Sequence, residues 1–163
     1  MGKVVSVNEL KDIRELLRRQ KKKVVFTNGC FDIIHRGHIE YLLRSKALGD
    51  VLVVGVNTDA SVRRIKGENR PIVEELDRAY IVANLGPVDF VCMFKEDTPY
   101  QLIARLVPDV LVKGADWKVD DIVGKDIVES AGGNVASIEF VPNYSTSKII
   151  QRIVDLFSRV DQR

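Results

Sequence analysis

The stretch from Val24 to Glu40 reads VVFTNGCFDIIHRGHIE, and it constrains the fold more than any other part of the chain. It begins with an apolar, β-branched run that is typical of a buried strand. An Asn-Gly pair then breaks the run, as a turn does. Apolar residues at helical spacing follow from Ile39 onward. The stretch therefore predicts a strand that turns into a helix, with His35 and His38 in the connection.

This connection has the chemistry of a phosphate site. A helix N-terminus presents free N–H groups and a partial positive charge, which together attract phosphate. Gly29 and Gly37 allow the backbone to approach a ligand closely, because they carry no Cβ. The imidazoles of His35 and His38 can donate N–H bonds to a phosphate that gains charge during a reaction. The residues alone therefore indicate phosphoryl or nucleotidyl chemistry.

Other readings of the same residues stay open at this point. Cys30, His35 and His38 could hold zinc, although a fourth ligand and a C-x-x-C pattern are missing. Two histidines can also be structural or solvated. A Rossmann dinucleotide site is disfavoured, because the chain has no G-x-G-x-x-G.

The rest of the chain alternates strands with helices. Further strands are expected at residues 51–56, 89–94, 109–112 and 135–141. This alternation predicts an α/β protein with a Rossmann-like, doubly wound parallel sheet of five strands. We expect one domain over residues 1–163, in which residues 1–22 form an N-terminal helix and residues 23–163 form the α/β core.

The first and last helices have recognisable starts. Asn8 is the expected N-cap of the first helix, which runs to about Arg19. Residues 145–147 open the last helix, whose apolar residues are expected to be buried: Ile149, Ile150, Ile153, Val154, Leu156 and Phe157. The basic cluster at residues 18–23 suits a helix C-terminus, with anion binding as the alternative.

Composition narrows the class of protein. A net charge of +2 over 163 residues argues against nucleic-acid binding. No apolar run is long enough to cross a membrane, and a signal peptide is not seen. Met1, Gly2 and Ser6 fit the short myristoylation pattern, but nothing else points to a membrane. Cys30 and Cys92 make no disulfide framework, so a cytoplasmic location is expected.

The segment TNGCFDIIHRGH resembles the signature of the HxGH nucleotidyltransferase superfamily, which includes the glycerol-3-phosphate cytidylyltransferases. The wider set of motifs, over roughly residues 23–153, is most similar to the adenylyltransferases of ADP-heptose synthesis. The resemblance implies strand order 3-2-1-4-5. Ligands in such sheets bind where the strand order reverses, here between the first and fourth strands. The HxGH loop and the segment 113–117 would then flank one crevice.

The resemblance also implies a reaction. A phosphate oxygen of a sugar 1-phosphate would attack the α-phosphorus of ATP, giving an ADP-sugar and pyrophosphate for lipopolysaccharide core or another surface glycan. This oxygen is already anionic, so positioning and charge stabilisation suffice. The expected cofactor is Mg²⁺ with ATP, held by the triphosphate and by no side chain. The expected partners are ATP and the sugar phosphate, and a homodimer is also expected.

Roles follow from the resemblance, residue by residue. His35 and His38 match the two histidines that stabilise the α-phosphate, and Lys66 matches a lysine that reaches the phosphates from a mobile loop. The expected nucleotide-binding residues are Asn28, Gly29, Cys30, Phe31, Gly37, Lys113, Ser145, Thr146 and Ser147. The expected substrate-binding residues are Asp32, Arg78, Asp116 and Trp117. Whether Trp117 stacks on the base or packs in the core stays open.

Departures from the family pattern refine the expectation. The chain has Val-Lys-Gly-Ala-Asp-Trp at residues 112–117, which favours the heptose branch and ATP over CTP. The acidic residue that precedes the family arginine is displaced here to Glu75 or Asp77. No kinase-like sequence accompanies the transferase motifs, so a stand-alone transferase is expected. The alternatives are a polyol-phosphate cytidylyltransferase, an FAD-synthase-like adenylyltransferase and a non-catalytic nucleotide-binding module.

Overall fold

The computed structural model describes residues 1–114, 121–139 and 141–158. Its centre is a six-stranded sheet in the order β1-β4-β3-β2-β5-β6, and every neighbouring pair is parallel. The strands are β1 (Lys3–Val4), β2 (Val24–Gly29), β3 (Val51–Asn57), β4 (Phe90–Phe94), β5 (Val110–Gly114) and β6 (Asn134–Ile138). The predicted α/β class and parallel, Rossmann-like sheet are therefore confirmed.

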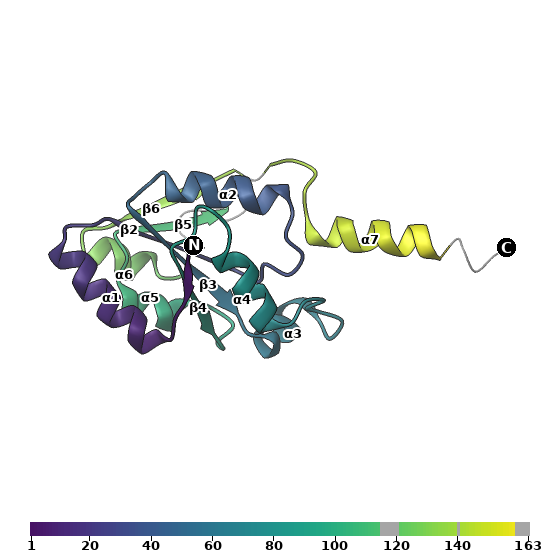
Figure 1. The fold of residues 1–163 in the computed structure, drawn as a ribbon, viewed down its shortest axis with the longest axis horizontal. Helices are drawn as coiled ribbons and strands as arrows, with labels where there is room; N and C mark the ends of the chain where they lie inside the picture. The colour runs from purple at the N-terminus through teal and green to yellow at the C-terminus, as the bar shows by residue number, and fades with distance from the viewer. Residues whose placement is uncertain (115–120, 140, 159–163) are drawn as a thin grey trace.

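Helices cover both faces of the sheet (Figure 1). They are α1 (Val7–Arg19), α2 (Arg36–Lys46), α3 (Asp59–Lys66), α4 (Glu75–Ala83), α5 (Tyr100–Leu106), α6 (Lys125–Ser130) and α7 (Thr146–Phe157). One apolar core lies between the sheet and helices α2 and α4, and a second lies between the sheet and helices α1, α5 and α6.

The alternation of side chains along β2 feeds both cores. Val25 packs in the core under α2 and α4, whereas Val24 and Phe26 pack in the core under α1 and α5. All three side chains have no exposed surface. A continuous apolar run is what a parallel strand covered on both faces requires, and this explains why residues 24–27 carry no polar alternation.

The predicted strand count was wrong. The sheet has six strands rather than five, because Lys3–Val4 adds a short edge strand in parallel pairing with β4. The five expected strands lie in the order β4-β3-β2-β5-β6. A strand of two exposed residues carries no apolar periodicity, so backbone pairing with Phe90 and Val91 defines it.

The start of α1 also differs from the prediction. Its N-cap is Ser6 rather than Asn8. The Ser6 hydroxyl accepts a hydrogen bond from the Glu9 backbone N–H at 3.2 Å, and the Glu9 carboxylate accepts one from the Ser6 N–H at 2.8 Å. This is a capping box, and the reciprocal pair places the helix start two residues before Asn8.

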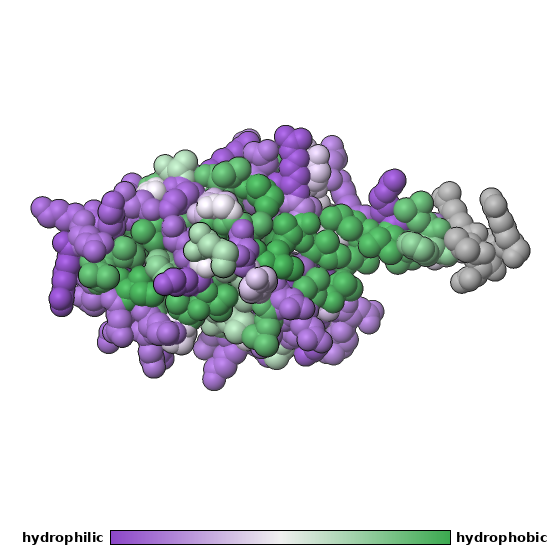
Figure 2. Space-filling view, in the orientation of Figure 1, coloured by the Kyte–Doolittle hydropathy of each residue, from purple (hydrophilic) through white to green (hydrophobic). Residues whose placement is uncertain are grey.

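Helix α7 is not buried as predicted. None of its described residues is buried, and its apolar side chains reach 47% exposure at Ile153 and 69% at Phe157. Figure 1 shows the helix projecting from the body, and Figure 2 shows apolar side chains on its surface. An amphipathic pattern predicts that one face needs a partner, but it does not say that the partner lies in the same chain.

No helix within the described ranges is long and apolar enough to cross a membrane.

Candidate active site

A cavity of about 570 Å³ opens at the carboxyl ends of β2, β3 and β5. Because β2 pairs with β3 on one side and with β5 on the other, the cavity lies where the strand order reverses. Thirteen of the sequence-predicted residues line it: Asn28, Gly29, Cys30, Phe31, Asp32, His35, Gly37, His38, Lys66, Lys113, Ser145, Thr146 and Ser147. The fold therefore brings together residues that are more than 100 positions apart in sequence.

The loop after β2 places the two histidines face to face. His35 is the N-cap of α2, and His38 lies in its first turn. Their rings are stacked, with centroids 3.8 Å apart and planes 16° from parallel. The ring of Phe31 supports His38 from the side, at a centroid distance of 5.2 Å. Helix α2 thus fixes both imidazoles at its N-terminus.

Gly37 is required by this packing. A Cβ at this position would lie 3.0 Å from Tyr144 Cβ and 3.1 Å from the ring of His35. Contacts this short would force either neighbour to move. The glycine therefore preserves the orientation of the His35 ring.

Both histidines are neutral at neutral pH. Burial lowers the pKa of His38 to about 4, with a further lowering by the charge of His35. Burial also lowers the pKa of His35. The Nδ1 atom of each ring is buried and has no hydrogen-bond partner among the described residues. The pair can therefore serve an anion as uncharged hydrogen-bonding groups.

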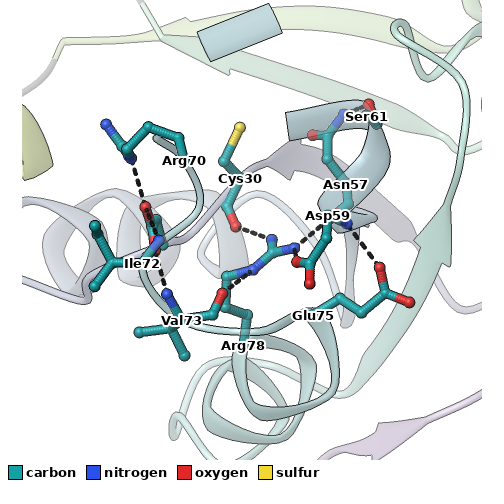
Figure 3. Close-up of polar contacts among 10 residues, drawn as sticks. Cys30, Asn57, Asp59, Ser61, Arg70, Ile72, Val73, Glu75 and Arg78 are labelled. Atoms are coloured by element: carbon teal, nitrogen blue, oxygen red, sulfur yellow. Dashed lines mark hydrogen bonds and ion pairs between the residues drawn. The ribbon is translucent and has the colours of Figure 1, made fainter. Parts of the chain in front are cut away.

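Arg78 has no exposed surface and does not line the cavity. Figure 3 shows its guanidinium among the polar groups around it. Its guanidinium donates to the carbonyl oxygens of Cys30, Val73 and Asn57 and forms an ion pair of 2.8 Å with Asp59. The prediction that Arg78 binds substrate is not supported by this placement. It joins the end of β2, the end of β3 and the start of α3.

Asp32 lies in the loop between β2 and α2, and its side chain has no exposed surface. Its carboxylate accepts hydrogen bonds from the backbone N–H groups of Ile72 and Val73, at 2.8 and 2.9 Å, and from Nε of Arg70 at 2.6 Å. Burial by itself would raise the pKa of Asp32, but these bonds hold the pKa below its ordinary value. The ionised carboxylate thereby ties the segment 70–73 to the loop after β2.

The segment before α7 lies against the HxGH loop and completes the wall beside the histidines. The Ser145 hydroxyl caps α7 by accepting a bond from the Lys148 N–H at 3.2 Å. The Thr146 hydroxyl lies 3.4 Å from the Ile33 carbonyl oxygen, which connects this segment to the HxGH loop. Ser145 therefore has a capping role in addition to its place on the cavity wall.

Two lysines reach the cavity from other elements. Lys113, at the end of β5, donates a hydrogen bond to the Asn28 side-chain oxygen. Lys66 is exposed on the last turn of α3, which ends at Gly67 in a positive-φ conformation of 98°. The predicted residues Asp116 and Trp117 lie outside the described residues.

Cys30 lies on the cavity wall as a thiol. Burial raises the pKa of the Cys30 thiol, so the thiol stays protonated at neutral pH. No group of three or more potential ligand side chains that could hold a metal ion occurs in the described part of the chain. The zinc alternative for Cys30 and the histidines therefore gains no support.

Sequence reasoning missed several residues of the cavity wall, and Arg70 and Tyr144 are two of them. Arg70 follows a polar turn and looks like an ordinary exposed arginine in the sequence. Tyr144 comes directly before the predicted segment 145–147, and its ring stacks at 6.4 Å from His35. An aromatic residue next to a phosphate-binding segment was the available signal for Tyr144. Arg70 had no such signal.

The site and sheet define the class: the chain belongs to the cytidylyltransferase-like family, whose model matches residues 26–152. The fold alone is shared with pantoate-beta-alanine ligase from Francisella tularensis, at a TM-score of 0.61 and 15% identity over 91% of this chain and 76% of that one. The match to the cytidylyltransferase-like family model runs from β2 through most of α7.

More particular relatives are found as well. The bifunctional protein HldE of Campylobacter concisus is 56% identical over 153 residues, which are 94% of this chain and 31% of that protein. HldE of Citrifermentans bemidjiense is 55% identical over 83% of this chain and 28% of that protein. This chain thus spans about a third of the length of these relatives. A lipopolysaccharide core biosynthesis protein from Thermoplasma volcanium is 33% identical, with a TM-score of 0.61 over 76% of this chain and 99% of that one.

Proposed function

We propose that this chain is an adenylyltransferase that joins ATP to a sugar 1-phosphate, D-glycero-D-manno-heptose 1-phosphate, and releases pyrophosphate. The ADP-sugar would serve lipopolysaccharide core or another surface glycan. The observation that carries the proposal is the stacked pair His35 and His38, uncharged and fixed at a helix N-terminus inside the cavity. The likeness to a lipopolysaccharide core biosynthesis protein supports the pathway.

The residues on the wall suit an in-line transfer at the α-phosphorus. The acceptor's phosphate oxygen forms a bond to this phosphorus while the bond to the bridging oxygen of the β-phosphate breaks, and pyrophosphate leaves. Negative charge builds on the non-bridging α-oxygens in the transition state. Donors that are already in place stabilise this charge without reorganisation, and His35 and His38 supply them.

The remaining groups position the nucleotide. The backbone of residues 28–31 and Gly37 would approach the phosphates, and residues 145–147 would hold the β- and γ-phosphates at the start of α7. Lys66 would reach the same phosphates from the end of α3, and Lys113 would contact the nucleotide beside Asn28. Asp116 and Trp117 remain proposed substrate contacts.

Mg²⁺ is proposed as the companion of ATP. The triphosphate would be its main ligand. The ion would neutralise phosphate charge when bound.

Pyrophosphate release tests the proposal directly. The chain is incubated with ATP or CTP and a panel of sugar and polyol phosphates, and the specificity constants are compared. We expect ATP with a heptose 1-phosphate to give the highest value. A clear preference for CTP with a polyol phosphate would assign the chain to the cytidylyltransferase alternative, and no turnover with any pair would leave only nucleotide binding.

Self-association and location are also proposed. The exposed apolar residues of α7, with Leu156 54% and Phe157 69% exposed, support a homodimer in which this face is covered. Light scattering of the protein should give twice the monomer mass, and replacing both residues by Ser should return it to the monomer. A monomeric parent protein would end this proposal. A cytoplasmic location stays a prediction from cysteine usage.

A further inference from the structure

Arg70 has the features of a ligand-binding residue, yet no role follows for it from the family signature. Its side chain lines the cavity and is 16% exposed. A guanidinium carries five N–H donors. Only Nε is engaged by the described residues, through the 2.6 Å bond to Asp32. The four donors on the two terminal nitrogens make no hydrogen bond within the described ranges.

The loop is anchored without these four donors. Asp32 already accepts bonds from the backbone N–H groups of Ile72 and Val73. The Arg70 backbone N–H closes a turn onto the Gly67 carbonyl at 3.0 Å. The contact between Arg70 Nε and Asp32 fixes the direction of the guanidinium. Holding the loop therefore does not account for the terminal nitrogens.

The surrounding charges favour an anion. Arg70, Arg78 and Lys66 all act on Cys30, in the direction that lowers its pKa. The guanidinium of Arg78 is already occupied by its hydrogen bonds to backbone carbonyl oxygens and by its ion pair with Asp59. Asp97, the other described carboxylate of the wall, pairs with Arg64 at 2.6 Å. The terminal nitrogens of Arg70 are not among the buried, unpartnered side-chain atoms of the described residues, so they face the open cavity, where an anionic ligand can reach them.

We propose that Arg70, oriented by the buried carboxylate of Asp32, binds a substrate phosphate with its two terminal nitrogens. The fork of a guanidinium matches two phosphate oxygens, and such bidentate bonds are strong. This proposal rests on the proposed function and adds a residue that recognises one of its phosphates. The phosphate belongs either to the acceptor sugar phosphate or to the triphosphate, and kinetics can separate the two.

The variants are Arg70→Ala and Arg70→Lys, with Arg63→Ala as a matched control. Arg63 lies on exposed α3, outside the cavity wall, and its loss changes the net charge equally. The KM for ATP and the KM for the sugar phosphate are measured separately with kcat. We expect Arg70→Ala to raise one KM by about 10- to 100-fold, as loss of charge-assisted bonds does. Arg70→Lys should recover only part of the loss, since an ammonium is a point charge.

Each outcome has one meaning. A rise confined to the sugar phosphate assigns Arg70 to the acceptor, and a rise confined to ATP assigns it to the triphosphate. The proposal is overturned if both KM values stay within about twofold of the parent protein. It is also overturned if kcat/KM falls equally for both substrates while backbone exchange over residues 67–73 speeds up, because Arg70 would then only hold the loop.

A second readout does not depend on turnover. The thermal unfolding midpoint is measured with ATP, with inorganic phosphate and with the sugar phosphate, because a ligand of the folded state raises it. Arg70→Ala should lose the rise caused by the phosphate it binds, and Arg63→Ala should keep it. If the parent protein transfers no nucleotide but shows a rise that depends on Arg70, the proposed function fails and the phosphate contact stands. If transfer occurs and no rise depends on Arg70, the phosphate contact fails alone.

Discussion

Replacing Arg78 by Met should destabilise the fold far more than a surface arginine would. Met is of similar length and apolar, so it keeps volume and removes every donor. The change leaves the carbonyl oxygens of Cys30, Val73 and Asn57 without the guanidinium, and it leaves the Asp59 carboxylate, 19% exposed, without its ion-pair partner. Breaking a buried ion pair costs about 3–5 kcal/mol, and each buried acceptor left unpaired costs about 1–3 kcal/mol.

These costs overlap, because water can enter from the cavity and the same relaxation serves all four groups. We therefore expect Arg78→Met to lower the free energy of unfolding by about 4 kcal/mol. Urea denaturation measures this loss. The control Arg63→Met lies on the exposed surface of α3 and should stay within about 0.5 kcal/mol of the parent protein.

A double-mutant cycle with Asp59→Asn tests the ion pair itself. Once the carboxylate is neutral, losing the guanidinium leaves no unpaired charge, so the double variant should lose less than the sum of the two single losses. The reasoning is refuted if Arg78→Met keeps its stability within about 1 kcal/mol while the KM for the sugar phosphate rises. Arg78 would then contact the substrate, as the family resemblance implies.

Three further predictions concern the cavity. His35→Ala and His38→Ala should each lower kcat by more than about 100-fold, since the two imidazoles act on transition-state charge. The affinity for ATP, measured by calorimetry, should change far less. Near-normal turnover in either variant would remove that histidine from the mechanism. The pKa of His38 is about 4 in the folded chain, against an ordinary value of 6.5. As the pH drops from 6.5 to 4, the unfolded chain binds a proton at His38 before the folded chain does, so the contribution of His38 to the free energy of unfolding falls. Between about pH 7 and pH 5 this loss should reach at most about 2 kcal/mol in urea denaturation and be absent in His38→Gln; equal pH slopes in both proteins would contradict it. Lys66→Ala should lower turnover strongly yet leave the unfolding free energy unchanged, because the side chain is exposed; a normal turnover would make Lys66 ordinary surface.

The sequence was most informative where function and local structure depend on the same residues. The apolar run of β2 and the helical pattern of α2 predicted the strand and the helix, because both faces of β2 are covered and α2 packs on one of them. The strand order that the resemblance implied predicted which two loops flank the crevice. The motif then predicted the wall residues between Asn28 and His38, since they lie close together along the end of β2, the loop after it and the start of α2.

Sequence reasoning was less successful where a role depends on distant partners. Arg78 matches a family motif, but its burial is set by the carbonyls of Cys30 and Asn57, which lie 48 and 21 residues away. The exposure of α7 depends on what else lies near the helix, and helical periodicity carries no such information. Arg70 is placed by Asp32, 38 residues earlier, and neither residue signals the other in the sequence.

The contacts of Arg78 and Asp32 hold one end of the loop between α3 and α4 and leave the other end less restrained. Arg78 holds the Val73 carbonyl, and Asp32 holds the N–H groups of Ile72 and Val73, so this end of the loop is fixed on both sides. Residues 67–69, at the other end, make no side-chain hydrogen bond or ion pair within the described ranges, and the hydrogen bonds of this end are backbone bonds from Gly67 to Arg63 and from Arg70 to Gly67. Movement of Lys66 should therefore hinge before residue 72. Hydrogen exchange without nucleotide should be slow at Ile72 and Val73 and fast at residues 67–69, and ATP with Mg²⁺ should slow only the latter. Fast exchange at Ile72 and Val73 would show that the whole loop moves and that Asp32 does not anchor it.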